Sequence, residues 1–154
     1  MNGMEPGISL RAATAADYDR IVAVVDDWWG RPVRHTLPRL FLDHFHDTSL
    51  VAERDGELAG FLVGFMSPSN PDDAYIHFAG VSPRARGNGL ARLLYETFFD
   101  RARTEGRRVV RAVTAAHNSV SIAFHTAMGF TVADPIPGYD GPSDVKVVFR
   151  RELT

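Results

Sequence analysis

One junction near the middle of the sequence limits the folds open to this chain. The run Ala74–Val81, AYIHFAGV, is apolar enough to be a buried strand. A helical pattern begins at Gly89 and is ended by Gly106, with apolar residues on one face at positions 90, 93, 94, 98 and 102. The ten residues 82–91, SPRARGNGLA, join the two patterns. A strand that feeds at once into a helix predicts a fold in which helices pack against a sheet.

The rest of the chain supplies the other elements of that fold. The predicted order is strand, two helices, three strands, helix, strand, helix and two strands, at residues 8–13, 14–29, 37–45, 50–54, 57–67, 74–81, 89–105, 107–114, 118–129, 130–134 and 144–153. Thr14 is the expected N-cap of the first helix, and Asp55-Gly56 is the expected hairpin turn. The pattern predicts an α/β (α+β) fold in a single domain over residues 1–154.

Composition excludes several kinds of site and partner. The chain has 154 residues, 45% of them hydrophobic, which suffices for a core. It has no cysteine, so disulfides, thiolate metal sites and a catalytic thiol are excluded. A net charge of −2 gives no reason to expect nucleic-acid binding. No signal-peptide pattern and no apolar run of about 20 residues is present, so we expect a cytoplasmic protein without membrane contact. His44 and His46 alone make a weak metal signal, and we expect no metal.

The joining segment has the features of a phosphate-binding turn. The first N–H groups of a helix lack partners inside the helix, and the helix dipole adds positive charge there. Gly87 and Gly89 tolerate positive φ and remove Cβ atoms that would hold an anion away, while Arg84 and Arg86 add charge. Glycines and arginines also make ordinary surface turns, so the segment alone leaves both interpretations open. A dinucleotide GxGxxG site is disfavoured because Arg92 holds the sixth position.

Two segments together resemble the GCN5-related N-acetyltransferase (GNAT) superfamily. Arg84, Gly87 and Gly89 fill the three fixed places of its acyl-CoA motif, Gln/Arg-x-x-Gly-x-Gly/Ala. The stretch NSVSIAFHTAMGF is similar to its second motif, which Asn118, Phe124, Gly129 and Phe130 match. The resemblance covers nearly the whole chain. It implies the GNAT fold, with a mixed, mostly antiparallel central sheet of about six to seven strands and about four helices.

The resemblance also implies acetyl-CoA as cosubstrate and assigns residues to it. The main chain of Ala79, Gly80 and Val81 would pair with the pantetheine arm. The pyrophosphate would be held by residues matching the motif, namely Arg84, Arg86, Gly87, Asn88, Gly89, Leu90, Ala91 and Arg92. Asn118 would face the pantetheine or the thioester end, and Phe124 would pack beside it.

Three residues are candidates for proton transfer. His77 lies on the strand Ala74–Val81 where some family members place a general base, although a lone histidine on an apolar strand is more often a core residue. Tyr75 is a second polar group on the same strand face. His125 stands where the family commonly has a tyrosine that protonates the leaving sulfur, and either that role or a structural one is open to it. We expect it at the edge of an apolar helix face formed by residues 120, 124, 127 and 128.

The acceptor is expected near the first helix. Asp26 and Asp27 would attract a cationic amine and Trp28 or Trp29 would stack on it, or else one tryptophan is core and the aspartates form a solvated helix end. The expected acceptor is a primary amine of a small molecule or peptide. The alternatives are a protein N-terminal or lysine acetyltransferase and a non-catalytic acyl-CoA sensor. Homodimers are frequent in the superfamily, so a homodimer stays open.

Overall fold

The computed structural model describes residues 7–154, and the contacts among them form two compact units. Unit 1 holds residues 7–65 and 76–101, and unit 2 holds residues 66–75 and 102–154. The division passes through two strands and one helix, residues 57–66, 73–81 and 90–104, so each unit takes part of all three. The prediction of a single domain over 1–154 stays a prediction.

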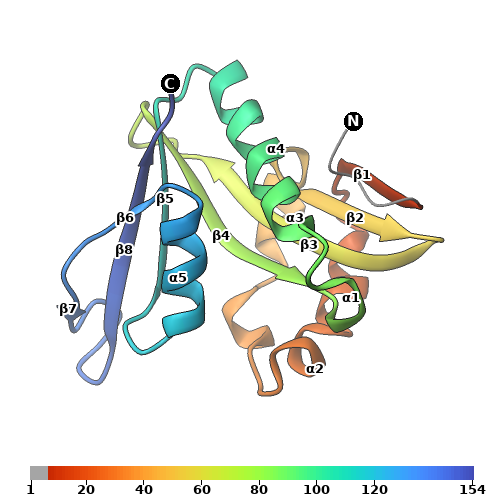
Figure 1. The fold of residues 1–154 in the computed structure, drawn as a ribbon, viewed down its shortest axis with the longest axis horizontal. Helices are drawn as coiled ribbons and strands as arrows, with labels where there is room; N and C mark the ends of the chain where they lie inside the picture. Colours follow the sequence, from red (N-terminus) through yellow and green to blue (C-terminus); the bar gives the residue numbers. More distant parts are fainter. Residues whose placement is uncertain (1–6) are drawn as a thin grey trace. The chain divides into compact units, whose positions relative to one another are not determined.

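Five α-helices and eight strands occur in the described residues (Figure 1). The elements are β1 (Ile8–Ala12), α1 (Asp17–Val22), α2 (Val25–Trp29), η1 (Arg34–Thr36), α3 (Leu40–Phe45), η2 (His46–Thr48), β2 (Leu50–Arg54), β3 (Glu57–Met66), β4 (Asp73–Val81), η3 (Pro83–Ala85), α4 (Leu90–Thr104), β5 (Val109–Ala115), α5 (Ser119–Ala127), β6 (Thr131–Val132), β7 (Ile136–Pro137) and β8 (Val145–Glu152).

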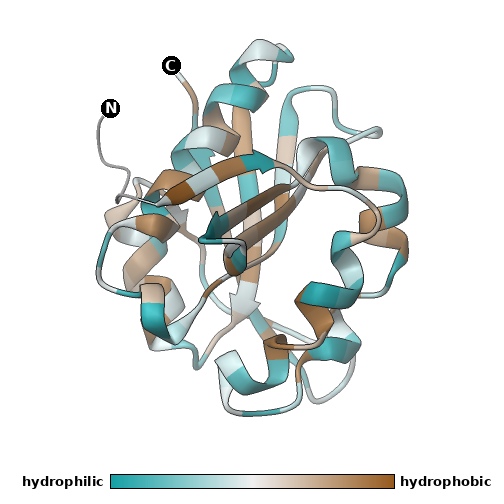
Figure 2. Cartoon of the chain, turned by 90° about the vertical axis from the view of Figure 1, so that its right-hand side faces the viewer, coloured by the Kyte–Doolittle hydropathy of each residue, from teal (hydrophilic) through white to brown (hydrophobic). Residues whose placement is uncertain are grey.

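Unit 1 has three layers around the strand order β1-β2-β3-β4. One face of the strands packs against α1, α2 and α3 through a buried cluster that includes Val51, Phe61 and Val63. Gly60 directly precedes Phe61 on β3, and a Cβ there would come within 3.2 Å of Leu90 and 3.3 Å of Leu94, so α4 packs on the opposite face. Period-two alternation along each strand explains why both faces are covered. Hydropathy colouring shows the central strands as mostly hydrophobic (Figure 2).

Unit 2 is built around β8, which pairs antiparallel with β5, β6 and β7. The start of β4, Asp73–Tyr75, pairs with β5 in parallel, with Tyr75 opposite Arg111. Phe149 of β8 and Val110 of β5 are fully buried at the centre of this unit. The predicted α+β class with a mixed, mostly antiparallel sheet is confirmed.

The predicted hairpin is also confirmed. Asp55 has φ +51° and Gly56 has φ +82°, the pair of positive values that a two-residue type I′ turn requires. This turn sets β2 against β3, with Leu50 opposite Leu62.

The first predicted helix, residues 14–29, is wrong as a single element. It breaks into α1 and α2 at Ala23 and Val24, and Val24 takes φ −121°. Four β-branched residues within five positions, 21, 22, 24 and 25, restrict side-chain rotamers in a helix and weaken it there. Thr14 is not the N-cap, because its hydroxyl donates to Asp17 (3.2 Å) while α1 begins at Asp17.

Two further expectations need correction in unit 2. On α5, Val120 is 80% exposed, so it does not belong to the apolar face, and His125 is buried, not at that face's edge. The loop after residue 134 contains β7, because Ile136 and Pro137 pair with the end of β8. A two-residue strand carries too short an alternation to be visible in the sequence.

Candidate functional site

The turn between β4 and α4 is held at its start by hydrogen bonds and packing. The Ser82 N–H donates to the Ala59 carbonyl at 2.8 Å, and the Ser82 hydroxyl accepts from the Arg84 N–H at 3.3 Å. Pro83 fits the first position of η3, where no N–H is needed. Ala85 is only 2% exposed and anchors the turn in the protein. The first half of the segment is therefore fixed in place.

The second half of the turn is open. Gly87 has φ +85° and Gly89 has φ +78°, so both adopt the positive φ that glycine tolerates. A Cβ at either position would meet no atom within 4 Å. The two glycines thus allow the chain to turn and leave the space beside their backbone uncovered.

The N-terminus of α4 follows directly after this turn. The first hydrogen bond into this helix runs from the Leu93 N–H to the Gly89 carbonyl at 3.0 Å. The N–H groups of residues 90, 91 and 92 therefore precede the helix's own hydrogen-bond ladder. Arg84 and Arg92 are exposed here, and Arg92 lies 3.8 Å from Glu96 one turn along. Open backbone, free N–H groups and positive charge together can bind an anion such as a phosphate.

The sequence indicates that Arg86 only adds charge to the turn, but in the structure its guanidinium is bound to two backbone carbonyls. Its Nε donates to the Val81 carbonyl at 3.2 Å, and its Nη2 donates to the Trp28 carbonyl at 2.8 Å. The guanidinium thus ties the end of β4 to α2 while it keeps its charge beside the turn.

The end of β4 packs closely on the tryptophans of α2. A Cβ on Gly80 would come within 2.5 Å of the Trp29 ring, so only glycine allows this contact. Trp29 lies 4.8 Å from Phe78, and Trp28 stacks on Phe61 with ring centroids 6.0 Å apart. Both tryptophans are half-buried against the core cluster of unit 1. The structure therefore favours packing for both, and acceptor stacking by either stays a prediction.

His77 is half-buried in unit 1 and held by two contacts. Its Nε2 lies 2.7 Å from the Thr36 carbonyl oxygen. Its ring stacks on that of Phe41, with the ring centroids 4.0 Å apart and an angle of 7° between the planes. A carbonyl can only accept, so Nε2 carries the hydrogen and, in the neutral ring, Nδ1 has the lone pair. Burial lowers the pKa of His77, and the bond to Thr36 partly offsets that effect. The neutral ring is the form that can accept a proton.

Asp26 is bound to the loop that follows α2. Its Oδ1 accepts from the Val33 N–H at 2.7 Å and from the Arg34 N–H at 3.0 Å. The bond from Val33, followed by the bond from Arg34, lowers the pKa of this carboxyl. Its expected part in acceptor binding stays a prediction.

Three candidates lie in unit 2. Asn118 caps α5, since its Oδ1 accepts from the Ser121 N–H at 3.1 Å and its amide donates to the Thr114 hydroxyl at 3.2 Å. Phe124 is half-buried, one residue before His125. Burial raises the pKa of Tyr75 to about 12, so its phenol keeps its proton at neutral pH.

His125 lies in the core of unit 2. It is 6% exposed, and its ring stacks on that of Phe149, with the ring centroids 4.1 Å apart and an angle of 3° between the planes. Its Nδ1 lies 2.8 Å from the Ser121 carbonyl one turn back in α5. Burial lowers its pKa, and the bond to Ser121 partly offsets this. These contacts favour the structural role over the general-acid role.

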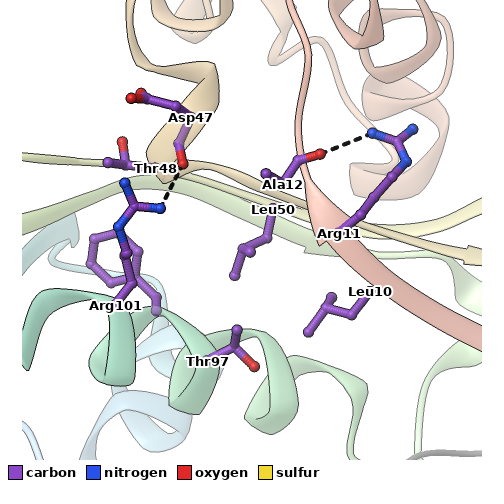
Figure 3. Close-up of a pocket in the computed structure, with 9 residues that line it drawn as sticks. Leu10, Arg11, Ala12, Asp47, Thr48, Leu50, Thr97 and Arg101 are labelled. Atoms are coloured by element: carbon purple, nitrogen blue, oxygen red, sulfur yellow. Dashed lines mark hydrogen bonds between the residues drawn. The ribbon is translucent and has the colours of Figure 1, made fainter. Parts of the chain in front are cut away.

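A cavity of about 300 Å³ lies elsewhere in unit 1, between β1, β2 and α4 (Figure 3). Two of its polar side chains are bonded to backbone, since Arg101 donates to the Asp47 carbonyl and Thr97 donates to the Leu93 carbonyl. Thr97 is eight residues past Gly89, about 12 Å along α4. None of the candidate site residues lines this cavity.

Residues 7–154 show neither a metal-binding cluster nor a helix that could span a membrane. They contain no cluster of three or more acidic or histidine side chains placed to hold a metal ion. None of their helices has both the length and the apolar content to cross a bilayer.

A sheet with helices packed against it, in which a strand runs through an open, glycine-lined turn into a helix, defines an α+β protein whose turn can accommodate an anion. Within that class, residues 18–130 match the family model of the acetyltransferase (GNAT) family. The chain belongs to this family. The structure of a GNAT-family protein from Desulfovibrio desulfuricans has the same fold, with a TM-score of 0.83 at 19% identity over 96% of this chain and 99% of that one.

Relatives and a second structure extend the comparison. An L-2,4-diaminobutyric acid acetyltransferase of Nocardia farcinica is 33% identical over 58% of this chain and 46% of its own length. A mycothiol acetyltransferase of Sanguibacter keddieii is 33% identical over 92% of this chain and 49% of its own length. The chain thus spans about half the length of these relatives. The Salmonella typhimurium protein yncA, solved with its cofactor acetyl-CoA, has a TM-score of 0.73 at 22% identity over 96% of this chain and 95% of that one.

The residues that hold His77 were not predicted from the sequence. Thr36 and Phe41 lie 41 and 36 positions before it in the chain, and neither shows a local pattern that points to a histidine. Only a comparison of many related sequences would contain such a signal, as paired changes at distant positions.

Proposed function

We propose that this chain is an acetyl-CoA-dependent N-acetyltransferase that acts on a primary amine of a small molecule or peptide. The observation that carries the proposal is the uncovered backbone at Gly87 and Gly89, immediately before the free N–H groups of α4. This arrangement fits the pyrophosphate of CoA, because residues 82–92 contain three arginines and no acidic residue. The main chain of Ala79–Val81 is the proposed pantetheine contact.

His77 is the proposed general base. When bound, acetyl-CoA supplies an activated thioester, which a neutral amine attacks with release of the CoA thiol. An alkylamine is mostly protonated at neutral pH, so a group must first remove its proton. Nδ1 of His77 can take that proton, because Nε2–H is committed to the Thr36 carbonyl and the lowered pKa keeps the ring neutral.

Other residues take supporting roles in the proposal. Tyr75 suits a hydrogen-bond donor because its pKa of about 12 keeps the phenol protonated. Asn118 and Phe124 are the proposed contacts of the pantetheine end, and Asn118 also fixes the start of α5. His125 is proposed to support the packing of α5.

The acceptor proposal draws on the relatives. Two of them are named for small molecules, L-2,4-diaminobutyric acid and mycothiol, which supports a small molecule over a protein N-terminus or lysine. Because the chain covers only about half of these proteins, the acceptor has to be measured directly. A cytoplasmic location is also proposed on the sequence pattern and a homodimer on the family resemblance, and sedimentation velocity tests the second.

Titration calorimetry with acetyl-CoA tests the cofactor part of the proposal. The wild-type chain should bind in the micromolar range or tighter, roughly −8 kcal/mol. Gly87→Val should weaken binding at least about tenfold, because the side chain would occupy the open turn. Gly56→Val is the matched control, since Gly56 has φ +82° and equally open surroundings but lies in the β2–β3 hairpin. Equal losses of affinity in both variants would contradict the assignment.

Release of free thiol across a library of amines tests the chemistry. Release with at least one small amine supports the proposal, and release only with peptides favours a protein acetyltransferase. Acetyl-CoA binding without release on any amine would favour a sensor that binds acyl-CoA. If the wild-type chain binds no acetyl-CoA, the proposed function is wrong.

A further inference from the structure

The loop between α2 and α3 is organised by one carboxylate. Asp26, in the first turn of α2, accepts hydrogen bonds from two consecutive N–H groups, those of Val33 (2.7 Å) and Arg34 (3.0 Å). Val33 is 4% exposed, so the loop is also anchored by its packing. Bonds from N–H groups to a charged acceptor are stronger than those to a neutral one. Asp26 therefore fixes where η1 begins.

The same loop ends at the carbonyl that holds His77. The Thr36 N–H and hydroxyl both donate to the Val33 carbonyl, at 2.9 Å and 2.6 Å. The Thr36 carbonyl in turn accepts from Nε2 of His77 at 2.7 Å. A continuous set of hydrogen bonds thus runs from Asp26 through Val33 and Thr36 to the imidazole.

We propose that Asp26 is a positioning residue for His77. It holds η1 so that the Thr36 carbonyl keeps the imidazole as the Nε2–H tautomer, with Nδ1 as the proton-accepting atom. This inference rests on the proposed function, in which His77 is the general base. It gives Asp26 a task other than attraction of a cationic acceptor, and the two tasks lead to different kinetic results.

The surroundings of His77 simplify the test. The rings against it are Phe41 of α3, at 4.0 Å, and Phe78 of β4, at 6.2 Å. The charged or titratable side chains on η1 and α3 are Arg34, His35, Asp43 and His44. The shift in the pKa of His77 comes from burial and from the Thr36 bond. A change at Asp26 should thus act on His77 through the loop and not through direct charge.

The test uses three variants of the full chain. Asp26→Ala removes the acceptor and should lower kcat roughly tenfold or more, with the KM of the amine changed less than about twofold. Asp26→Asn keeps an oxygen that can accept from Val33 and should restore most of that loss. Asp43→Ala removes a like charge from α3 and should leave the rate unchanged. If Asp26 instead bound a cationic acceptor, Asn would be as damaging as Ala and the loss would fall on KM.

A second readout does not depend on activity. Nitrogen-15 NMR of the His77 ring should show one neutral tautomer, with hydrogen on Nε2, in the wild type and in Asp26→Asn. In Asp26→Ala the ring should show a mixture of both tautomers, provided that circular dichroism confirms a folded chain. If that variant does not fold, Asp26→Ser, which keeps a short acceptor, replaces it and should lie between Ala and Asn.

The outcomes separate this inference from the proposed function. An unchanged tautomer and an unchanged rate in Asp26→Ala overturn the positioning role, while acetyl transfer by the wild type still stands. A wild-type chain with no acetyl transfer overturns the function, and the tautomer comparison then still tests whether Asp26 controls the ring.

Discussion

His77 and His125 have almost the same local contacts, yet they differ in the exposure of the ring and in the origin of the carbonyl that each ring contacts. Each ring stacks nearly parallel on a phenylalanine, at 4.0 Å on Phe41 and at 4.1 Å on Phe149. Each places one nitrogen within 2.8 Å of a backbone carbonyl. Burial lowers the pKa of both. A lowered pKa alone therefore does not distinguish a base from a packed core histidine.

The difference lies in the origin of the partner carbonyl and in exposure. The carbonyl at His125 belongs to Ser121, one turn back in the same helix, and its ring is 6% exposed among core aromatics. The carbonyl at His77 belongs to Thr36, 41 residues away in η1, and the ring stays half-buried. A helix supplies the first bond without further organisation, whereas the second requires a loop fixed in place. Such additional organisation is typical of a functional residue.

The largest expected effect comes from removal of the His77 ring. His77→Ala should lower kcat by about 10²- to 10⁴-fold, the usual loss for a general base, with acetyl-CoA affinity retained. Rapid-mixing assays of thiol release and calorimetry measure the two quantities. His44→Ala, which removes an exposed histidine from α3, is the control and should retain its rate. A full rate in His77→Ala would break the comparison, because the two histidines would then both be structural.

Sequence patterns predicted the part of this comparison that depends on local structure. The turn at Gly87 and Gly89 and the Asp55-Gly56 hairpin both follow from residue preferences at consecutive positions. The family resemblance made His77 a candidate general base, and His125 a candidate for protonation of the leaving sulfur or for a structural role. The burial of His125 was not predicted, because an i−4 carbonyl and a stacked ring from β8 satisfy it in a way that helical periodicity does not reveal. The link from the Asp26–Thr36 loop to His77 was missed because the Thr36 carbonyl and the His77 ring lie 41 residues apart in the chain.

The next effect in size is on stability. His125→Ala should lower the free energy of unfolding by about 2–4 kcal/mol, because it leaves a cavity beside Phe149 and removes the partner of the Ser121 carbonyl. Urea unfolding measures this loss, and the rate per folded molecule should stay within about twofold of the wild type. His125→Phe keeps an aromatic ring in place and provides a folded variant if the alanine protein is too unstable. A rate loss of about 100-fold in His125→Phe with stability intact would instead make His125 the general acid.

The smallest expected effect sharpens the comparison through pH. A base acts only when deprotonated, so kcat/KM should rise with pH through the pKa of His77, and the lowered pKa places this acid limb below the ordinary histidine range. Phe41→Leu exposes the His77 ring to more water, which raises its pKa toward the ordinary value and moves the acid limb of the kcat/KM profile to higher pH.

The control, Phe149→Leu, makes the same change beside His125 and should cost about 1 kcal/mol of stability without moving the acid limb. Use of one amine throughout cancels the acceptor's own titration. Equal shifts in both variants would mean that the limb does not report on His77, since only one of the two phenylalanines contacts that ring.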